Sequence, residues 1–203
     1  MKNVKHSVVW LLNDDVETGT NLVGKKIVPI FQPRGADGPA VTESMDIALT
    51  VDSDPRYGPV DHFRPASSRS DIGDWFQSNA ELIRRLTRPR LVNAPLPEFA
   101  FRDARETYIR NHALPAPEDY DVNLGKSAEY LAQLQPQIQA LDDMIYCPAC
   151  CTEGGISFDD VDLYPRFRTL TVLKDLAWPP KTLEYNKHHS DISEVAEYSV
   201  FAT

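Results

Sequence analysis

Cysteine is scarce in this sequence: the chain has three cysteines, all between positions 147 and 151. Such a cluster lacks the spaced pairs of a disulfide framework, which excludes a small disulfide-stapled secreted protein. Positive charge is also in short supply, with 21 Lys and Arg against 30 Asp and Glu and a net charge of −9. Nucleic acids and anionic membrane surfaces require a basic face, so we expect neither as a partner.

Long hydrophobic runs are absent as well, because none approaches the roughly 20 residues of a membrane span. The N-terminal stretch MKNVKHSVVWLLNDD has no small-residue cleavage site, and acidic residues follow its apolar run directly, so we expect no signal peptide. The hydrophobic fraction of 42% is ordinary for a globular protein with a core. These features predict an acidic cytoplasmic protein with no membrane partner.

Residues 1–53 have the pattern of a small α/β domain. The expected elements are strands at 8–12, 27–31 and 41–42 and helices at 16–23 and 43–51. Gly24 directly follows the first of these helices and provides its end. Pro29 lies inside the second strand, which is unusual because proline cannot donate to a strand ladder.

The rest of the chain favours helices. The proline-rich segment 54–66 indicates a linker, and residues 67–203 form the predicted all-helical domain. Within that domain, apolar residues near helical spacing predict helices at 70–92, 101–112 and 123–146. Ser157 and Asp160 have the spacing of a capping box, which predicts that a further, strongly apolar helix starts there.

Several stretches of this sequence resemble the glutaredoxin 2 family, whose members are bacterial glutaredoxins built like glutathione S-transferases. The similar stretches are LLNDD at 11–15, VGKK and VPI within 23–30, ESMDI at 43–47 and DDVDLYPRFRTLTVLKDLAWP at 159–179. The resemblance covers essentially the whole chain. It implies an α/β plus all-α fold, in which a remnant of a thioredoxin-like domain precedes a glutathione S-transferase-like C-terminal helical domain.

Four residues match the glutathione-binding positions of that family. By resemblance, Val28 and Pro29 are the Val–cis-Pro pair whose backbone binds the cysteinyl part of glutathione. Glu43 and Ser44 match the pair that holds the γ-glutamyl end, at a helix N-terminus that favours a carboxylate. The residues alone leave other interpretations open, because Ser44 also suits a plain helix cap and Pro29 an edge-strand proline.

The resemblance also indicates that the family's first strand and its cysteine-bearing helix are missing from this sequence. Family members begin with a strand and a C-P-Y-C helix, roughly 20 residues by average element lengths, and the match here starts after them. The family's nucleophilic cysteine therefore has no counterpart at its own position. We expect this chain to bind glutathione as cosubstrate, but to be inactive as a glutathione-disulfide oxidoreductase acting on protein or low-molecular-weight disulfides.

Two explanations for this absence stay open. In the first, which the retained glutathione-binding residues favour, the natural product starts upstream of Met1 and carries the active-site cysteines. In the second, the chain is a non-catalytic glutathione-binding or protein-interaction module. Without the family's first strand, residues 8–12 lose their partner, which predicts a monomer or a weak dimer through the open edge.

Residues 146–151, YCPACC, contain a C-x-x-C pair, so Cys147 and Cys150 are the alternative catalytic residues. Redox chemistry of this kind requires a low-pKa thiolate, which a helix N-terminus normally supplies. Here a predicted helix ends at about Tyr146, and its negative end is expected to raise the pKa of Cys147. We therefore interpret Cys147, Cys150 and Cys151 as a loop cluster.

A zinc site is the other interpretation of this stretch, with His188 and His189 completing a tetrahedral set. A structural zinc site normally combines two such cysteine pairs, and the sequence has one. Adjacent histidines also point apart on a helix, and we expect both on a solvated surface. The sequence thus predicts no metal.

Overall fold

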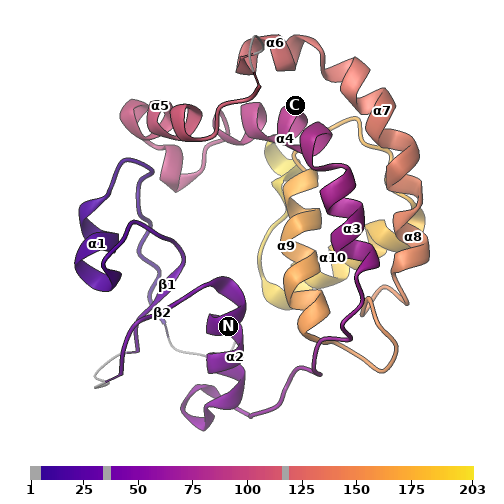
Figure 1. The fold of residues 1–203 in the computed structure, drawn as a ribbon. Helices are drawn as coiled ribbons and strands as arrows, with labels where there is room; N and C mark the ends of the chain where they lie inside the picture. Colours follow the sequence, from indigo (N-terminus) through magenta and orange to yellow (C-terminus); the bar gives the residue numbers. More distant parts are fainter. Residues whose placement is uncertain (1–5, 34–37, 116–118) are drawn as a thin grey trace. The chain divides into compact units, whose positions relative to one another are not determined.

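The computed structural model describes residues 6–33, 38–115 and 119–203 (Figure 1). The chain divides into two compact units, Met1–Phe63 with Leu96–Asn111 and Arg64–Pro95 with His112–Thr203. We call them the N-terminal unit and the helical unit. The domain limits predicted from the sequence, at residues 53 and 67, stay a prediction.

The N-terminal unit combines a two-stranded ladder with short helices. Its elements are α1 (Glu17–Val23), β1 (Ile30–Phe31), β2 (Val41–Thr42), α2 (Ser44–Ser53), the 3₁₀ turns η1 (Pro55–Tyr57) and η2 (Pro97–Phe99), and α5 (Arg102–Asn111). Gly24 ends α1 in the left-handed conformation, at φ 76°, as predicted. The Asn13 side chain donates to the Glu98 carbonyl over 3.4 Å, which connects the start of the unit to its later segment.

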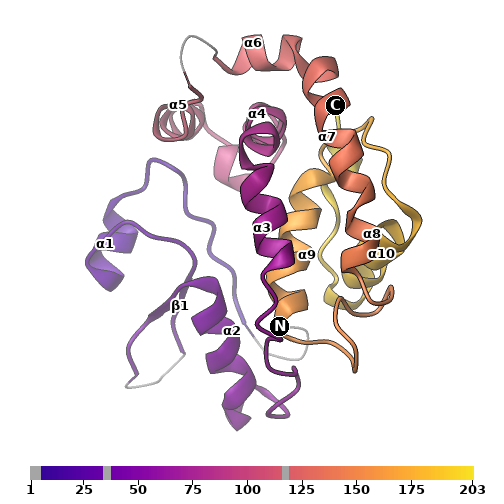
Figure 2. The same cartoon turned by 45° about the vertical axis from the view of Figure 1, so that its right-hand side comes forward.

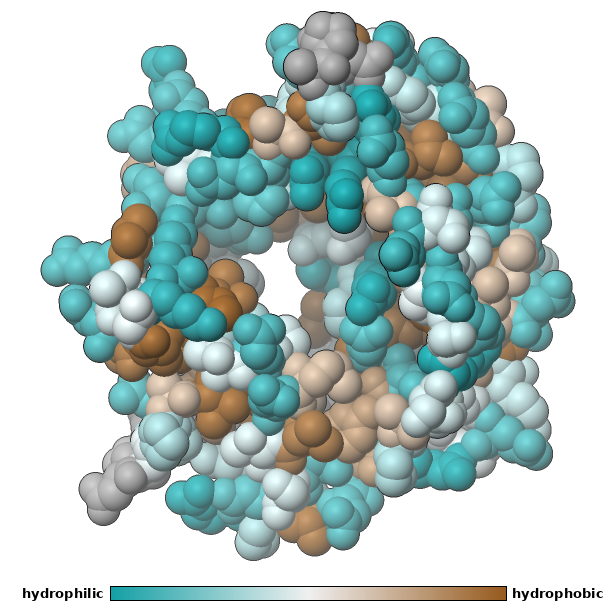
Figure 3. All heavy atoms as spheres, viewed as in Figure 1, coloured by the Kyte–Doolittle hydropathy of each residue, from teal (hydrophilic) through white to brown (hydrophobic). Residues whose placement is uncertain are grey.

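The strand predicted at residues 8–12 is wrong. Val8, Val9 and Trp10 have no regular secondary structure, and they expose 59%, 78% and 61% of their surface. An apolar run becomes a strand only where a neighbour pairs with its backbone, and the sheet within the described residues contains β1 and β2 alone. Figure 3 shows hydrophobic residues at the surface of this part of the chain, around α1 and β1.

The helical unit is built from seven α-helices and one 3₁₀ turn among its described residues. They are α3 (Asp71–Ser78), α4 (Ala80–Leu91), α6 (Tyr120–Gly125), α7 (Ser127–Gln139), α8 (Leu141–Met144), α9 (Phe158–Leu170), α10 (Pro180–Ser193) and η3 (Tyr198–Phe201). Helix α9 runs alongside α3 in both ribbon views (Figures 1 and 2). It contributes Leu163, Phe167 and Leu170 to the core, each with no exposed surface.

Two predicted helices are divided in the structure. The helix expected at 70–92 becomes α3 and α4, which meet at the buried Asn79, whose side chain donates to the Trp75 carbonyl over 2.9 Å. The helix expected at 123–146 is replaced by α6, α7 and α8. Among the described residues, none of the helices combines the length and the hydrophobicity that a membrane crossing requires.

Candidate functional sites

The four residues predicted to bind glutathione lie at one end of the β1–β2 ladder. Val28 and Pro29 directly precede β1, and Glu43 and Ser44 directly follow β2. Ile30 pairs with Thr42 in an antiparallel register. The ladder ends at this pair, so Val28–Pro29 lead directly into it on one segment and Glu43–Ser44 leave it on the other. The two segments that the sequence analysis selected separately therefore meet within the N-terminal unit.

The backbone at this corner is unusual on both segments. The Val28–Pro29 peptide bond is cis, and Val28 is 64% exposed. Glu43 has φ 70° and ψ 125°, a conformation that residues other than glycine rarely adopt. Sparsely populated conformations of this kind cluster at ligand clamps and active sites. The Glu43 carbonyl accepts from the Ile47 N–H over 3.0 Å, so the start of α2 fixes the position of this residue.

The N-terminus of α2 is open for a ligand. Its cap residue, Glu43, makes no side-chain hydrogen bond to the helix, and both Glu43 and Ser44 are exposed. The first N–H groups of a helix have no intrahelical partner and favour a negative charge. Asp46 lies in the first turn of α2, and its negative charge works against the binding of an anion there. The corner thus presents a hydroxyl and free N–H groups beside the Val28 backbone.

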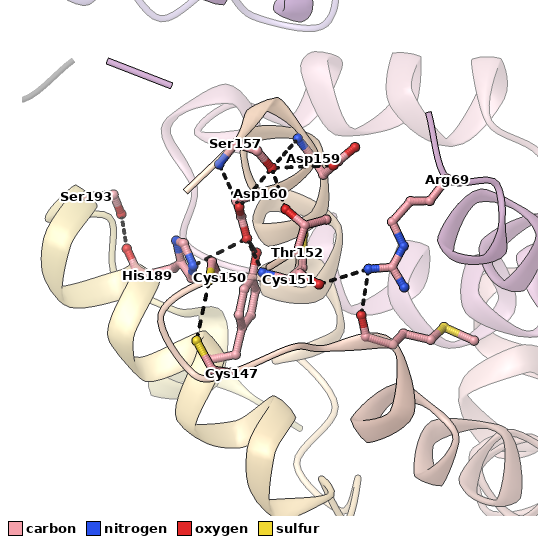
Figure 4. Close-up of polar contacts among 12 residues, drawn as sticks. Arg69, Cys147, Cys150, Cys151, Thr152, Ser157, Asp159, Asp160, His189 and Ser193 are labelled. Carbon is pink, nitrogen blue, oxygen red and sulfur yellow. Dashed lines mark hydrogen bonds and ion pairs between the residues drawn. The ribbon is translucent and has the colours of Figure 1, made fainter. Parts of the chain in front are cut away.

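The cysteines form a second candidate site in the helical unit, which we call the cysteine hairpin, residues 147–150. The Cys147 N–H donates to the Cys150 carbonyl over 3.0 Å, and the Cys150 N–H donates back over 3.1 Å. Their Sγ atoms lie 3.4 Å apart and share a hydrogen bond (Figure 4). Arg69 holds the base of the hairpin by donating to the carbonyls of Cys151 and Met144, over 2.9 and 2.8 Å.

The electrostatics of the hairpin contradict the sequence-based expectation for Cys147. Burial works to raise the pKa of Cys147, but the Cys150 thiol and the N–H groups of Ala149 and Cys150 stabilise its thiolate and lower the pKa overall. The expectation placed the end of the preceding helix at about Tyr146, whereas α8 ends earlier, at Met144. Burial and the neighbouring Cys147 raise the pKa of Cys150 to about 11.

Asp160 connects the hairpin to α9 and α10. Its side chain is 1% exposed. One oxygen accepts from the Cys151 N–H over 2.7 Å and from the Tyr185 hydroxyl over 2.9 Å, and the other accepts from the Ser157 N–H over 2.9 Å. The capping box predicted for Ser157 and Asp160 is confirmed. The contact with Tyr185 has no sequence signal, because it depends on how two helices pack.

His189 is buried rather than solvated, so that expectation is wrong. Its exposed fraction is 5%, its ring centroid lies 4.2 Å from that of Tyr185, and its Nε2 lies 3.8 Å from an Asp160 oxygen. Burial lowers the pKa of His189 to about 4, although Asp160 acts in the opposite direction. The part of the chain that the structure describes contains no cluster of three or more His, Cys, Asp or Glu side chains suited to a metal ion.

Comparison with known proteins agrees with this architecture. A family model, Glutaredoxin 2, C terminal domain, matches residues 71–202. Glutaredoxin 2 of Escherichia coli strain K12 is 30% identical over 196 residues, which cover 96% of this chain and 87% of that protein, and the protein of strain O157:H7 gives the same values. The crystal structure of glutaredoxin 2 from Salmonella typhimurium in complex with glutathione matches with a TM-score of 0.83 and 28% identity, covering 95% of this chain and 85% of that one.

The family model spans more than half of the chain, and the E. coli relatives are covered over most of their length. The predicted fold class is confirmed by the structural match: a thioredoxin-like N-terminal part is followed by a helical, glutathione S-transferase-like part. The chain therefore belongs to the glutaredoxin 2 family.

Proposed function

We propose that this chain is a cytoplasmic glutathione-binding protein of the glutaredoxin 2 type, with Val28, Pro29, Glu43 and Ser44 as its binding residues. The observation that carries the proposal is the register of β1 and β2, in which Ile30 pairs with Thr42. This register supports a joint site, because Val28–Pro29 and Glu43–Ser44 come from separate segments and share one end of the ladder. The glutathione complex of the Salmonella relative supports the choice of ligand.

Each part of glutathione has a chemically suitable partner at this corner. The backbone of Val28, a residue that is 64% exposed, can exchange hydrogen bonds with the cysteinyl part, in the way that an extended peptide adds to a sheet edge. The free N–H groups at the start of α2 and the Ser44 hydroxyl suit the carboxylate of the γ-glutamyl end. Glutathione is a peptide with a carboxylate at each end, so it fits a site that combines these two features.

The catalytic step requires a thiolate that attacks a disulfide. All three cysteines of the sequence lie at 147–151, so none belongs to the N-terminal unit. We therefore propose that this chain holds the glutathione-binding half of the family's site without its nucleophile. The same observation favours a second candidate, a non-catalytic glutathione-binding or protein-interaction module. Both candidates lack a nucleophile at the glutathione site, so neither predicts turnover there in an assay of glutathione-dependent reduction of a low-molecular-weight disulfide. Turnover that persists in the Cys147→Ser variant would contradict both.

The binding site itself is tested by NMR titration of the ¹⁵N-labelled chain with reduced glutathione. We expect saturable shifts of the amide signals of Val28, Glu43 and Ser44, while Pro29 has no amide proton to report. Amides at the far end of α2, such as that of Ser53, serve as the internal control and should move little. Unchanged signals at millimolar glutathione, or shifts confined to the helical unit, would overturn the proposal.

A further inference from the structure

We propose that Cys147 and Cys150 form a redox-active dithiol in the helical unit, in which Cys147 attacks an accessible disulfide and Cys150 resolves the mixed disulfide. The inference shares no residue with the proposed glutathione site and does not rest on it. It replaces the interpretation of these cysteines as a loop cluster, one ground of which was a helix end that the structure does not place at Cys147.

The first argument is the distance between the two sulfurs. Their separation of 3.4 Å has only to close to the roughly 2.05 Å of a disulfide bond. The backbone pairing of Cys147 with Cys150 already fixes both residues side by side. The bond can therefore form by a small side-chain movement.

The second argument is the difference in accessibility between the three thiols. Cys147 is half-buried, whereas Cys150 and Cys151 have exposed fractions of 4% and 1%. An external disulfide therefore reaches Cys147 more readily than the two buried thiols. This division gives Cys147 the role of attacking thiol and Cys150 the role of resolving thiol. Cys151 lies beside the Asp160 carboxylate, which together with burial raises its pKa and keeps it protonated.

The third argument is that hydrogen bonds hold the hairpin in this geometry from several sides. Arg69 and Asp160 hold the backbone of Cys151 at one arm. Lys181 Nζ donates to the carbonyls of Asp142 and Ile145, over 2.6 and 2.8 Å, at the other. A reactive pair held by rigid supporting contacts needs little rearrangement before reaction.

The reaction balances without any group beyond the disulfide itself. The Cys147 thiolate attacks one sulfur of a disulfide RSSR, forms a Cys147–SR bond and releases RS⁻, which takes up a proton. Cys150 then loses its proton and attacks the Cys147 sulfur, so that the Cys147–Cys150 bond forms and a second RSH leaves. The two cysteines give up two electrons and two protons in total, and the disulfide becomes two thiols. Excess thiol reverses both steps.

The test equilibrates the full 203-residue chain in buffers of reduced and oxidised glutathione, followed by acid quenching, alkylation of free thiols and peptide mass spectrometry. We expect a peptide with a Cys147–Cys150 bond, two hydrogens lighter and with Cys151 alkylated. Cys150→Ser should instead trap one glutathione on Cys147, and Cys147→Ser should block both products. Cys151→Ala is the matched control and should oxidise like the wild type. The wild-type measurement stands even where a variant fails to fold.

Three results would overturn the proposal. The first is a wild-type chain whose Cys147 and Cys150 both stay alkylatable in fully oxidised glutathione. The second is a dominant bond from either residue to Cys151. The third is a Cys147 alkylation rate whose pH midpoint lies at or above 9.0, the ordinary thiol value from which its surroundings lower the pKa. Ser44→Ala, which should weaken glutathione binding, is expected to leave the Cys147–Cys150 bond unchanged, so the failure of one proposal is distinguishable from the failure of the other.

Discussion

The buried Asp160 carboxylate accepts a hydrogen bond of 2.7 Å from the backbone N–H of Cys151. The same side chain caps the start of α9 through Ser157 and accepts from the Tyr185 hydroxyl on α10. One carboxylate therefore joins a helix start, a second helix and the loop that carries the cysteines. The geometry of the cysteine hairpin depends on a residue whose local role is that of a helix cap.

Asp160→Ala should destabilise the helical unit by at least about 3 kcal/mol, because it leaves several buried donors without an acceptor at roughly 1–3 kcal/mol each. Urea unfolding followed by circular dichroism measures the change. Asp162→Ala is the matched control on the same helix, since Asp162 is 46% exposed and forms a surface pair with Arg166 at 2.9 Å. That pair should contribute about 0.5 kcal/mol or less. Equal effects of the two substitutions would contradict the role assigned to Asp160.

Stability should fall with acidification in the window set by His189. Its pKa is about 4 in the folded chain and 6.5 as an ordinary value, so the unfolded chain binds more protons between these pH values. Stability therefore rises as the pH increases from 4 to 6.5 and is lost as the pH falls through that window. The full effect is on the order of 3 kcal/mol. Urea unfolding at pH 7, 6, 5 and 4 measures it.

Two histidine variants isolate that contribution. His189→Asn removes the buried titrating group and should flatten the stability profile between pH 6.5 and 4. His188→Gln changes the neighbouring, half-buried ring, which is a smaller cause of the lowered His189 pKa than burial, and should keep most of the wild-type profile. If the profile flattens with His188→Gln and not with His189→Asn, the assignment of the pH dependence to His189 is contradicted.

Gly19 and Gly73 should respond in opposite directions to alanine. A Cβ on Gly19 would lie 2.9 Å from the Lys25 carbonyl oxygen, whereas a Cβ on Gly73 meets nothing within 4 Å. Gly19→Ala should therefore destabilise α1 by about 1–3 kcal/mol through overpacking. Gly73→Ala should stabilise α3 by about 0.5–1 kcal/mol through helix propensity. Amide hydrogen exchange in the two helices measures both, and a slower exchange of α1 in Gly19→Ala would refute the close approach.

Features that depend on residues adjacent in the sequence were predictable. The Ser157–Asp160 capping box and the Gly24 helix end each involve a few adjacent residues, and both are present. The pairs Val28–Pro29 and Glu43–Ser44 were found by their resemblance to a family rather than by any pattern of charge or spacing. The strands around them were located by their apolar runs, although β1 is shorter than predicted.

Features that depend on contacts between residues far apart in the sequence, or on the shape of a turn, were not predictable. Residues 8–12 have the composition of a strand, but composition does not reveal whether another strand pairs with them. The lowered pKa of Cys147 arises from hairpin N–H groups and from Cys150, whose positions follow from the turn and not from the preceding helix. His189 is buried because Tyr185 and Tyr164 pack around it, with ring centroids 4.2 and 5.7 Å away.

The most direct test of the glutathione site is isothermal titration of the 203-residue chain with reduced glutathione, in the wild type and in two serine variants of α2. The account predicts saturable binding that Ser44→Ala weakens by about tenfold, the value of one hydrogen bond to a charged group. Ser53→Ala, at the other end of the same helix, should bind like the wild type. Absence of binding by the wild type, or equal affinities of Ser44→Ala and the wild type, would contradict it.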